Sequence, residues 1–229
     1  MMTIALLCAV AQGTWGQLSG EGSAESFTYV KRSWDENTKT VKSETVTEQS
    51  INSITLSGSH PDEWLGLGSG DDNDDHYYVV TGDVSYQTLN VFGRAHLILS
   101  DGATLTCTGG IKVEKANNNA HLFIYSQSDG SDQGQLIVTN NYEHAAGIGS
   151  SKGQECGEVT IHGGIIDVTG AKWGAGIGAG GHNRPGRAKD GITTVYGGTI
   201  TARGGEFGAG IGGGAGLDYG GCDGGEFCL

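Results

Sequence analysis

The tetrapeptide Ala-Gly-Ile-Gly occurs three times in the second half of the chain, and these copies decide the fold. They stand at Ala146–Gly149, Ala175–Gly178 and Ala209–Gly212. A longer echo lies between them, because Val159–Gly170 (VTIHGGIIDVTG) aligns with Thr193–Gly204 (TTVYGGTITARG). Repeats of this kind are typical of an elongated stack of similar units, in which each unit packs against its neighbours.

The alignment also separates inward from outward positions. Matching Gly163-Gly164 to Gly197-Gly198 gives an offset of 34 residues (197 − 163). Side chains alternate between the two faces of a strand, so apolar pairs at every second position mark the core side. The inward pairs are Ile161/Val195, Ile166/Ile200 and Val168/Ala202, and the outward pairs are Thr160/Thr194, Asp167/Thr201 and Thr169/Arg203.

Each repeat of about thirty residues holds three short strands. In one copy these are Val159–Ile161, Ile165–Thr169 and the Ala-Gly-Ile-Gly segment. Three strands per coil is the cross-section of a parallel β-helix, and strand crossovers in parallel sheets are right-handed. We therefore predict an all-β protein, a right-handed parallel β-helix (solenoid). The isoleucine of each tetrapeptide would fill the core, and its glycines would let neighbouring coils approach closely.

Short strands without helical spacing precede the repeats, and they predict that the solenoid spans 77–229. The expected strands are Tyr78–Val80, Thr88–Val91, His96–Leu99, Thr104–Cys107, Ile111–Val113, His121–Tyr125 and Gln135–Val138. Residues 17–76 form a separate N-terminal β-rich region. Within it, Phe27–Trp34 and Lys39–Val46 predict a hairpin around the turn-like Asp35–Thr38, and Pro61–Asp75 predicts a loop.

The first sixteen residues predict a secretory signal peptide. Ile4–Val10 is an apolar run too short to span a bilayer, and Thr14 and Gly16 supply small residues before a cleavage site at Gln17. No Lys or Arg precedes the apolar run, which departs from the usual signal. Export would place the protein outside the cell or on its outer surface. It would also permit disulfides.

Four cysteines remain after the signal: Cys107, Cys156, Cys222 and Cys228. Their pairing cannot be deduced from sequence. Cys107 continues the alternation of Ala103 and Leu105, which favours a small core residue.

The charge balance restricts the partners. With 13 Lys and Arg against 26 Asp and Glu, the formal net charge is −13. Nucleic acids and anionic membranes are poor partners for such a chain, and we expect no membrane insertion. The run Asp71–Asp75 begins like a calcium loop, but His76 and Gly82 replace the glycine and glutamate that such a loop needs. A solvated acidic loop is the favoured interpretation, so we predict no metal site and no cofactor, although calcium remains chemically possible.

Several segments resemble a known family. They are Tyr77–Val84 (YYVVTGDV), His96–Thr106 (HLILSDGATLT), Gly109–Val113 (GGIKV), Leu122–Ser128 (LFIYSQS) and the Gly-Ile-Gly repeats. This pattern is similar to the secreted, glycine-rich β-helix proteins of gut Bacteroidota such as Bacteroides and Prevotella, which are often described as carbohydrate-binding. The resemblance covers about residues 1–215. It implies the β-helix architecture and secretion, and it carries no catalytic motif.

The C-terminus departs from that pattern. After Gly216 the family would continue with a Val-Thr-Ile strand and a Gly-Gly pair, whereas this chain reads Leu217–Leu229 and stops. A solenoid needs a cap on its last coil, so we expect a chain truncated at its C-terminus.

Three aromatic side chains recur at one repeat position and are the main candidate site. His144, Trp173 and Phe207 each lie four residues before the isoleucine of a tetrapeptide, so the stack should place them in one line. Such a line could offer a strip on which sugar rings stack. It could equally be a structural stack that covers the edge of the coils.

The segment between the second and third tetrapeptides contains an insertion with basic side chains, and it is a second candidate. His182, Arg184 and Arg187 would present polar groups on a loop at the edge of the solenoid, where an acidic glycan could dock. A loop that is merely soluble is the alternative.

No pattern in the sequence supports catalysis. Among the outward positions of the aligned repeats Asp167 is the lone carboxylate, whereas glycosidases need a pair. We therefore predict a non-catalytic, secreted or cell-surface protein that presents a surface for adhesion or for binding a polysaccharide or host glycan. A polysaccharide lyase or hydrolase and a purely structural spacer are the alternatives, since fold alone implies no activity.

Overall fold

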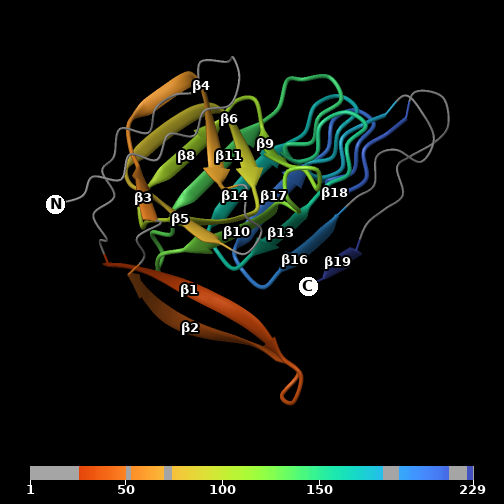
Figure 1. The fold of residues 1–229 in the computed structure, drawn as a ribbon. Helices are drawn as coiled ribbons and strands as arrows, with labels where there is room; N and C mark the ends of the chain where they lie inside the picture. The colour runs from red at the N-terminus through yellow and green to blue at the C-terminus, as the bar shows by residue number, and fades with distance from the viewer. Residues whose placement is uncertain (1–25, 50–52, 70–73, 183–190, 217–225, 229) are drawn as a thin grey trace.

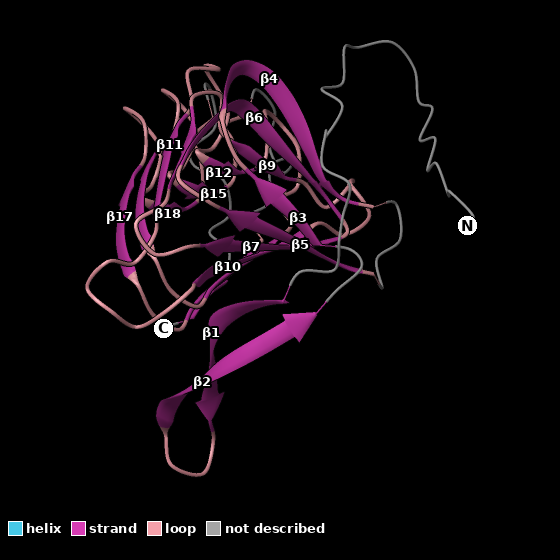
Figure 2. Cartoon of the chain, turned by 90° about the vertical axis from the view of Figure 1, so that its left-hand side faces the viewer, coloured by secondary structure: helices cyan, strands magenta, loops and turns pink. Residues whose placement is uncertain are grey.

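The computed structural model describes residues 26–49, 53–69, 74–182, 191–216 and 226–228. The predicted signal peptide, Arg184, Arg187 and Cys222 lie outside these residues. The described residues contain strands and loops but no helix (Figure 2). The strands are β1 Ser26–Asp35, β2 Thr40–Gln49, β3 Ser53–Leu56, β4 Ser59–Gly68, β5 Asp75–Val80, β6 Asp83–Phe92, β7 Arg94–Leu99, β8 Thr104–Cys107, β9 Ile111–Val113, β10 His121–Ser126, β11 Gln135–Thr139, β12 Ile148–Gly149, β13 Glu158–Ile161, β14 Ile165–Thr169, β15 Ile177–Gly178, β16 Ile192–Val195, β17 Thr199–Arg203, β18 Ile211–Gly212 and β19 Glu226–Cys228.

The chain winds into a parallel β-helix, as predicted (Figure 1). One sheet runs in the order β19-β16-β13-β10-β7-β5-β3, and every pairing in it is parallel. A second sheet bends around a corner and supplies the other two sides of each coil. It bends because β6 is long enough to pair β8 with its first half and β9 with its second half.

The repeat alignment gave the correct register. Ile161 is paired with Val195 and Ile166 with Ile200 across neighbouring coils. The isoleucines of the three tetrapeptides form one continuous column, because Ile148 pairs with Ile177 and Ile177 with Ile211. The first two are buried and Ile211 is half-buried.

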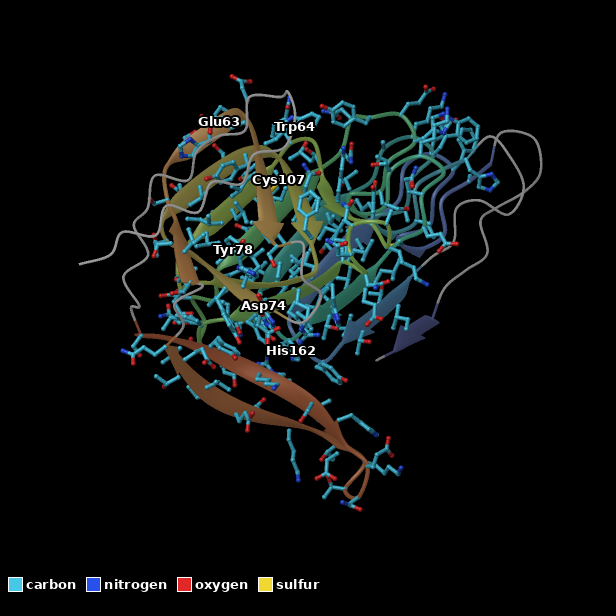
Figure 3. The ribbon with its side chains drawn as sticks, in the orientation of Figure 1. Glu63, Trp64, Asp74, Tyr78, Cys107 and His162 are labelled. Atoms are coloured by element: carbon cyan, nitrogen blue, oxygen red, sulfur yellow. The ribbon has the colours of Figure 1, made fainter. Side chains whose placement is uncertain are left out.

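The core is a set of such apolar columns. On one side of the coils Leu105, Leu136, Ile166 and Ile200 follow one another, each hydrogen-bonded strand adding one residue to the column. Cys107 is fully buried in this core, as predicted, and burial raises the pKa of its thiol (Figure 3). Buried apolar area of this kind supplies most of the stabilisation of a solenoid.

The second glycine of the tetrapeptide is needed for the coils to stack. Gly149 has φ +143°, and a Cβ placed there would lie 1.9 Å from the carbonyl oxygen of Gly178 in the next coil. Gly178 and Gly212 have similar φ values of +127° and +125°. An L-residue rarely adopts this conformation, so both backbone geometry and space require glycine.

The parallel ladder begins earlier than predicted. The sequence placed its first strand near Tyr77, but β3 already pairs with β5, and β4 pairs with β6. The segment predicted as a loop, Pro61–Asp75, therefore contributes to a strand. Pro61 is tolerated because the register of β4 shifts between His60 and Trp64, next to the proline.

The chain also continues the first sheet after Gly216. The sequence analysis assigned no strand to this segment, yet β19 pairs in parallel with β16. It was missed because Glu226–Cys228 shares no residue pattern with the earlier repeats.

The predicted hairpin is present and lies against the first sheet. Strands β1 and β2 pair along their whole length, from Ser26 opposite Gln49 to Asp35 opposite Thr40. The Asp35 side chain accepts hydrogen bonds from the backbone N–H groups of Asn37 and Thr38, which stabilises the turn. Figures 1 and 2 show the turn pointing away from the β-helix.

The hairpin covers aromatic side chains on the outer face of the first sheet. Tyr29 packs against Tyr77 and Tyr125, with ring centroids 6.3 and 4.5 Å apart. Arg32 donates to the carbonyl of His162 and to Asp129, and His162 lies at the boundary between sheet and hairpin (Figure 3). Thr160, predicted to face solvent, points out of the coil but is buried, and it is hydrogen-bonded to His121 at 2.8 Å.

Candidate ligand-binding ridge

The predicted line of rings is observed. His144, Trp173 and Phe207 stand in the turns that precede β12, β15 and β18. The rings of His144 and Trp173 are 6.0 Å apart and inclined by 15°, and those of Trp173 and Phe207 are 4.1 Å apart and inclined by 21°. The turns themselves stack, because Trp173 N donates to Glu143 O and Phe207 N to Lys172 O, both at 3.0 Å.

Exposure rises along the line. The His144 side chain is buried at 7% exposure, Trp173 is half-buried, and Phe207 is 46% exposed. Each ring covers part of the ring before it. The sequence left two interpretations open, a structural stack and a strip for sugar rings, and each fits a different part of the line. The stack is structural at His144 and offers an accessible ring at Phe207.

Charged side chains border the rings. Lys172 Nζ lies 5.7 Å from the Trp173 ring centre and 5.9 Å from that of Phe207. The same ammonium is 3.7 Å from Glu206. The Glu143 carboxylate lies 3.9 Å from His144 Nε2. The Glu143 carboxylate and the Lys172 ammonium can both hydrogen-bond to a ligand on the rings.

Two further aromatic residues extend this line, and sequence reasoning missed both. Trp64 on β4 is 42% exposed and Tyr142 is 48% exposed. With His144 they line one hollow of about 270 Å³. Trp64 lies in the segment predicted as a loop, and Tyr142 aligns with Ala171 and Gly205, so neither recurs in the repeat. We call Trp64, Tyr142, His144, Trp173 and Phe207 the aromatic ridge.

The hollow has a fixed aromatic wall and a positive rim. Trp64 Nε1 donates to Gln87 Oε1, which orients the indole. Lys112 Nζ lies 5.1 Å from the Trp64 ring centre, and Lys152 also lines the hollow. Burial, and then the ammonium of Lys152, lower the pKa of His144, so the imidazole is neutral at pH 7.

A more polar hollow of about 400 Å³ lies on the other side of the Asn141–Glu143 turn. It is lined by Thr139, Asn140, Asn141, Glu143, Thr169, Gly170, Ala171 and Lys172. Glu143 borders both hollows. A chain-like ligand on the ridge would therefore meet hydroxyl, amide and charged groups on one flank.

The second candidate site was the basic insertion, and the structure differs from the expectation at His182. His182 was expected on an exposed loop, but it is 4% exposed, and its backbone bridges to Gly216 of the next coil. Its backbone therefore belongs to the regular coil, and its side chain is buried. Arg184 and Arg187 lie outside the described residues.

A polar network at the edge of the hairpin has the residue types of a catalytic relay, but its histidine and tyrosine are buried. Asp75 accepts hydrogen bonds from Arg94 Nε at 2.6 Å and His96 Nε2 at 2.8 Å, and Tyr125 lies 3.1 Å from His96 Nδ1. Burial lowers the pKa of His96. His96 and Tyr125 are buried beneath the hairpin, whereas the side chains of Arg94 and Asp75 are partly exposed. The acidic run therefore ends in a structural carboxylate, Asp75, in place of the solvated residue we expected.

No group of three or more His, Cys, Asp or Glu in the described part of the chain is arranged to hold a metal ion. The outward carboxylate Asp167 is paired with Arg203. Among the described residues, no helix is long and apolar enough to cross a membrane.

Comparison with known proteins supports the architecture. A family model described as a beta helix repeat matches residues 159–181 and 194–215. These are the two segments that the internal alignment superposed, and each covers parts of all three sides of a coil. The chain thus carries β-helix repeats and folds as a parallel β-helix. No curated protein and no solved structure matches it.

Proposed function

We propose that the protein is a non-catalytic, secreted or cell-surface β-helix that binds glycans along the aromatic ridge. The observation that supports this most directly is the stack of His144, Trp173 and Phe207 at one corner of three successive coils. Trp64 and Tyr142 open onto one hollow, and Phe207 exposes its ring at the other end of the stack.

The geometry of the ridge suits an extended sugar chain. Neighbouring coils are spaced by the inter-strand distance of about 4.8 Å, so rings on successive coils form a continuous platform. Aromatic faces attract the apolar C–H faces of sugar rings, and neighbouring polar groups fix their orientation. Glu143 and Lys172 lie beside the platform and supply such groups.

Monomeric soluble proteins bury most of their large aromatic side chains. Exposed apolar groups that gather on one surface, rimmed by polar residues, mark sites of interaction. Trp64, Tyr142 and Phe207 are three of the six most exposed large apolar residues in the described chain, and they share one ridge. A purely structural spacer would gain nothing from these rings in solvent, which favours binding over the spacer alternative.

A lyase or hydrolase is the less favoured alternative. Lyases and hydrolases that cleave polysaccharides need clustered carboxylates, often with a cation, beside the bound chain. On the ridge and its flanks the described carboxylates include Glu143, Glu206, which is close to Lys172, and Glu114, which accepts a hydrogen bond from Ser151 N. Secretion is supported by the predicted signal peptide and by the resemblance to secreted Bacteroidota proteins.

A glycan array with the full chain, run with and without calcium, tests the proposal. We expect retention of extended polysaccharides in both conditions, without release of shorter products. Absence of binding to every glycan would favour the spacer. Shortened products in the same samples would establish the enzyme alternative instead.

A further inference from the structure

The cations around the ridge indicate which glycans it takes. Two lysines, Lys112 and Lys152, line the hollow beside Trp64 and Tyr142. Among the described residues, no carboxylate forms an ion pair with either ammonium. Lys172 adds a third ammonium over Trp173 and Phe207.

This gathering of lysines contrasts with the rest of the molecule. The chain contains twice as many acidic as basic side chains, 26 against 13. The lining of the hollow reverses this balance, with Lys112 and Lys152 against Glu143. The carboxylate of Glu114 accepts a hydrogen bond from the backbone N–H of Ser151, and Glu206 is close to Lys172. A protein with a strongly negative field repels anions, so a local excess of cations at a ligand-sized hollow needs a function.

The hollow fits one charged sugar. Its volume of about 270 Å³ lies near the lower end of the range of ligand pockets, roughly 300–1,000 Å³. The Trp64 indole, held by Gln87, forms an apolar wall, and the Lys112 ammonium lies over that ring. A sugar stacked beside the indole would bring an acidic substituent within reach of Lys112 and Lys152.

We infer that the ridge binds acidic polysaccharides, with the carboxylate of a uronic acid held between Lys112 and Lys152 while its ring packs beside Trp64 and Tyr142. The inference rests on the glycan-binding function proposed above and specifies its ligand class. Glu143 borders the same hollow and opposes the anion, which limits affinity and makes it dependent on salt.

Affinity electrophoresis through gels containing polygalacturonate, alginate or hyaluronate tests the ligand class. Each polymer is compared with its carboxyl-reduced form, which keeps the chain and removes the charge. We expect at least one acidic polymer to retard the full chain, and its reduced form to do so at least tenfold less. Sodium chloride at 0.5 M should weaken the retention, since exposed ion pairs are screened at such ionic strength.

Substitutions test the residues. Lys112→Met and Lys152→Met keep the length of the side chain and should each weaken retention about three- to tenfold, whereas Glu143→Gln should strengthen it. Lys39→Met, on the hairpin turn, is the matched control and should change nothing. Thermal melting of all four variants should match the parent protein.

The outcomes separate the two proposals. If acidic and carboxyl-reduced polymers retard the protein equally, and the lysine variants are retarded like the parent, the preference for acidic polysaccharides is overturned. Glycan binding itself would then remain in place. Lack of retention by these and by every neutral polysaccharide on the array would overturn both.

Discussion

At the scale of single residues, the stability of this protein depends on columns of identical positions rather than on individual contacts. Ile166 lies between Leu136 and Ile200 in one column and is 1% exposed. A side chain in such a column touches core atoms of the coils on both sides, so a change at one coil is felt by its two neighbours.

Replacing Ile166 by aspartate should therefore lower the free energy of unfolding by about 3 kcal/mol or more, because an unpaired charge would be buried. Thr199→Asp, at an exposed position of the neighbouring strand, should change it by less than about 0.5 kcal/mol. Denaturant titration of both variants measures the difference. Similar losses in the two would show that the inward and outward faces are assigned wrongly.

Gly149 provides a test of coil stacking. Alanine there would adopt an unfavourable φ and place its Cβ 1.9 Å from Gly178 O, so Gly149→Ala should destabilise by about 2–4 kcal/mol. Gly66→Ala is the control, since its Cβ would have its nearest neighbour at 3.6 Å. The melting temperatures of the two variants check the prediction. A Gly149→Ala protein that melts with the parent would contradict the close approach of the coils.

Single residues also show where sequence reasoning succeeds. The inward partners of the repeats were predictable because apolar periodicity and glycine spacing fix the register directly. The burial of Thr160 and His182 was not predictable. Thr160 is hydrogen-bonded to His121 on the neighbouring strand, and His182 bridges to the next coil. Both effects depend on packing between segments distant in sequence.

At the scale of elements, the hairpin is an added layer rather than part of the solenoid. It packs on β10 and its neighbours through Tyr29 and through Arg32, and strand β2 is largely exposed. An isolated two-stranded ribbon is at best marginally stable, so the hairpin depends on this docking. The sequence predicted the ribbon from its alternation and turn residues. The surface on which it docks involves outward rings from three different strands, β5, β7 and β10, and was not foreseen.

Buried histidines make the docking of the hairpin sensitive to acid. Burial lowers the pKa of His162 from 6.5 to about 4 and that of His121 to about 3. These groups stay neutral in the folded protein while the unfolded chain binds protons below pH 6.5. The contribution of these neutral histidines to the free energy of unfolding is therefore complete above pH 6.5, and it is lost as the pH falls toward 4. The hydrogen bond between His162 Nδ1 and the Arg32 carbonyl partly offsets this lowering of the pKa, whereas the charges of Lys31 and Arg32 add to it.

Hydrogen exchange measures this effect. Between pH 7.5 and pH 4.5, after correction for intrinsic rates, protection of β1 amides should fall at least tenfold more than protection of β11 amides. In His162→Gln the pH-dependent loss should be smaller. Equal changes in both strands at both pH values would contradict an acid-sensitive docking surface.

At the scale of the whole molecule, the fold distributes its surfaces between tasks. The first sheet is covered by the hairpin, whereas the corner that carries the aromatic ridge stays open to solvent. The β-helix holds His144, Trp173 and Phe207 in line because they stand in equivalent turns of three successive coils, and Trp64 and Tyr142 line the adjoining hollow. The recurrence of His144, Trp173 and Phe207 made half of this site predictable. The other half lies outside the repeat, where periodicity carries no information.

The most direct test of the ridge is affinity electrophoresis with the polysaccharide that the array identifies. Phe207→Ala removes an exposed ring from the ridge, and Trp34→Ala removes an exposed ring from the hairpin, remote from it. We predict that Phe207→Ala lowers retention about tenfold, equivalent to ~1.4 kcal/mol, while Trp34→Ala retains the parent affinity and both melt within a few degrees of the parent. Equal retention of all three proteins, or an early melting of Phe207→Ala without any retention of the parent, would contradict a glycan-binding ridge.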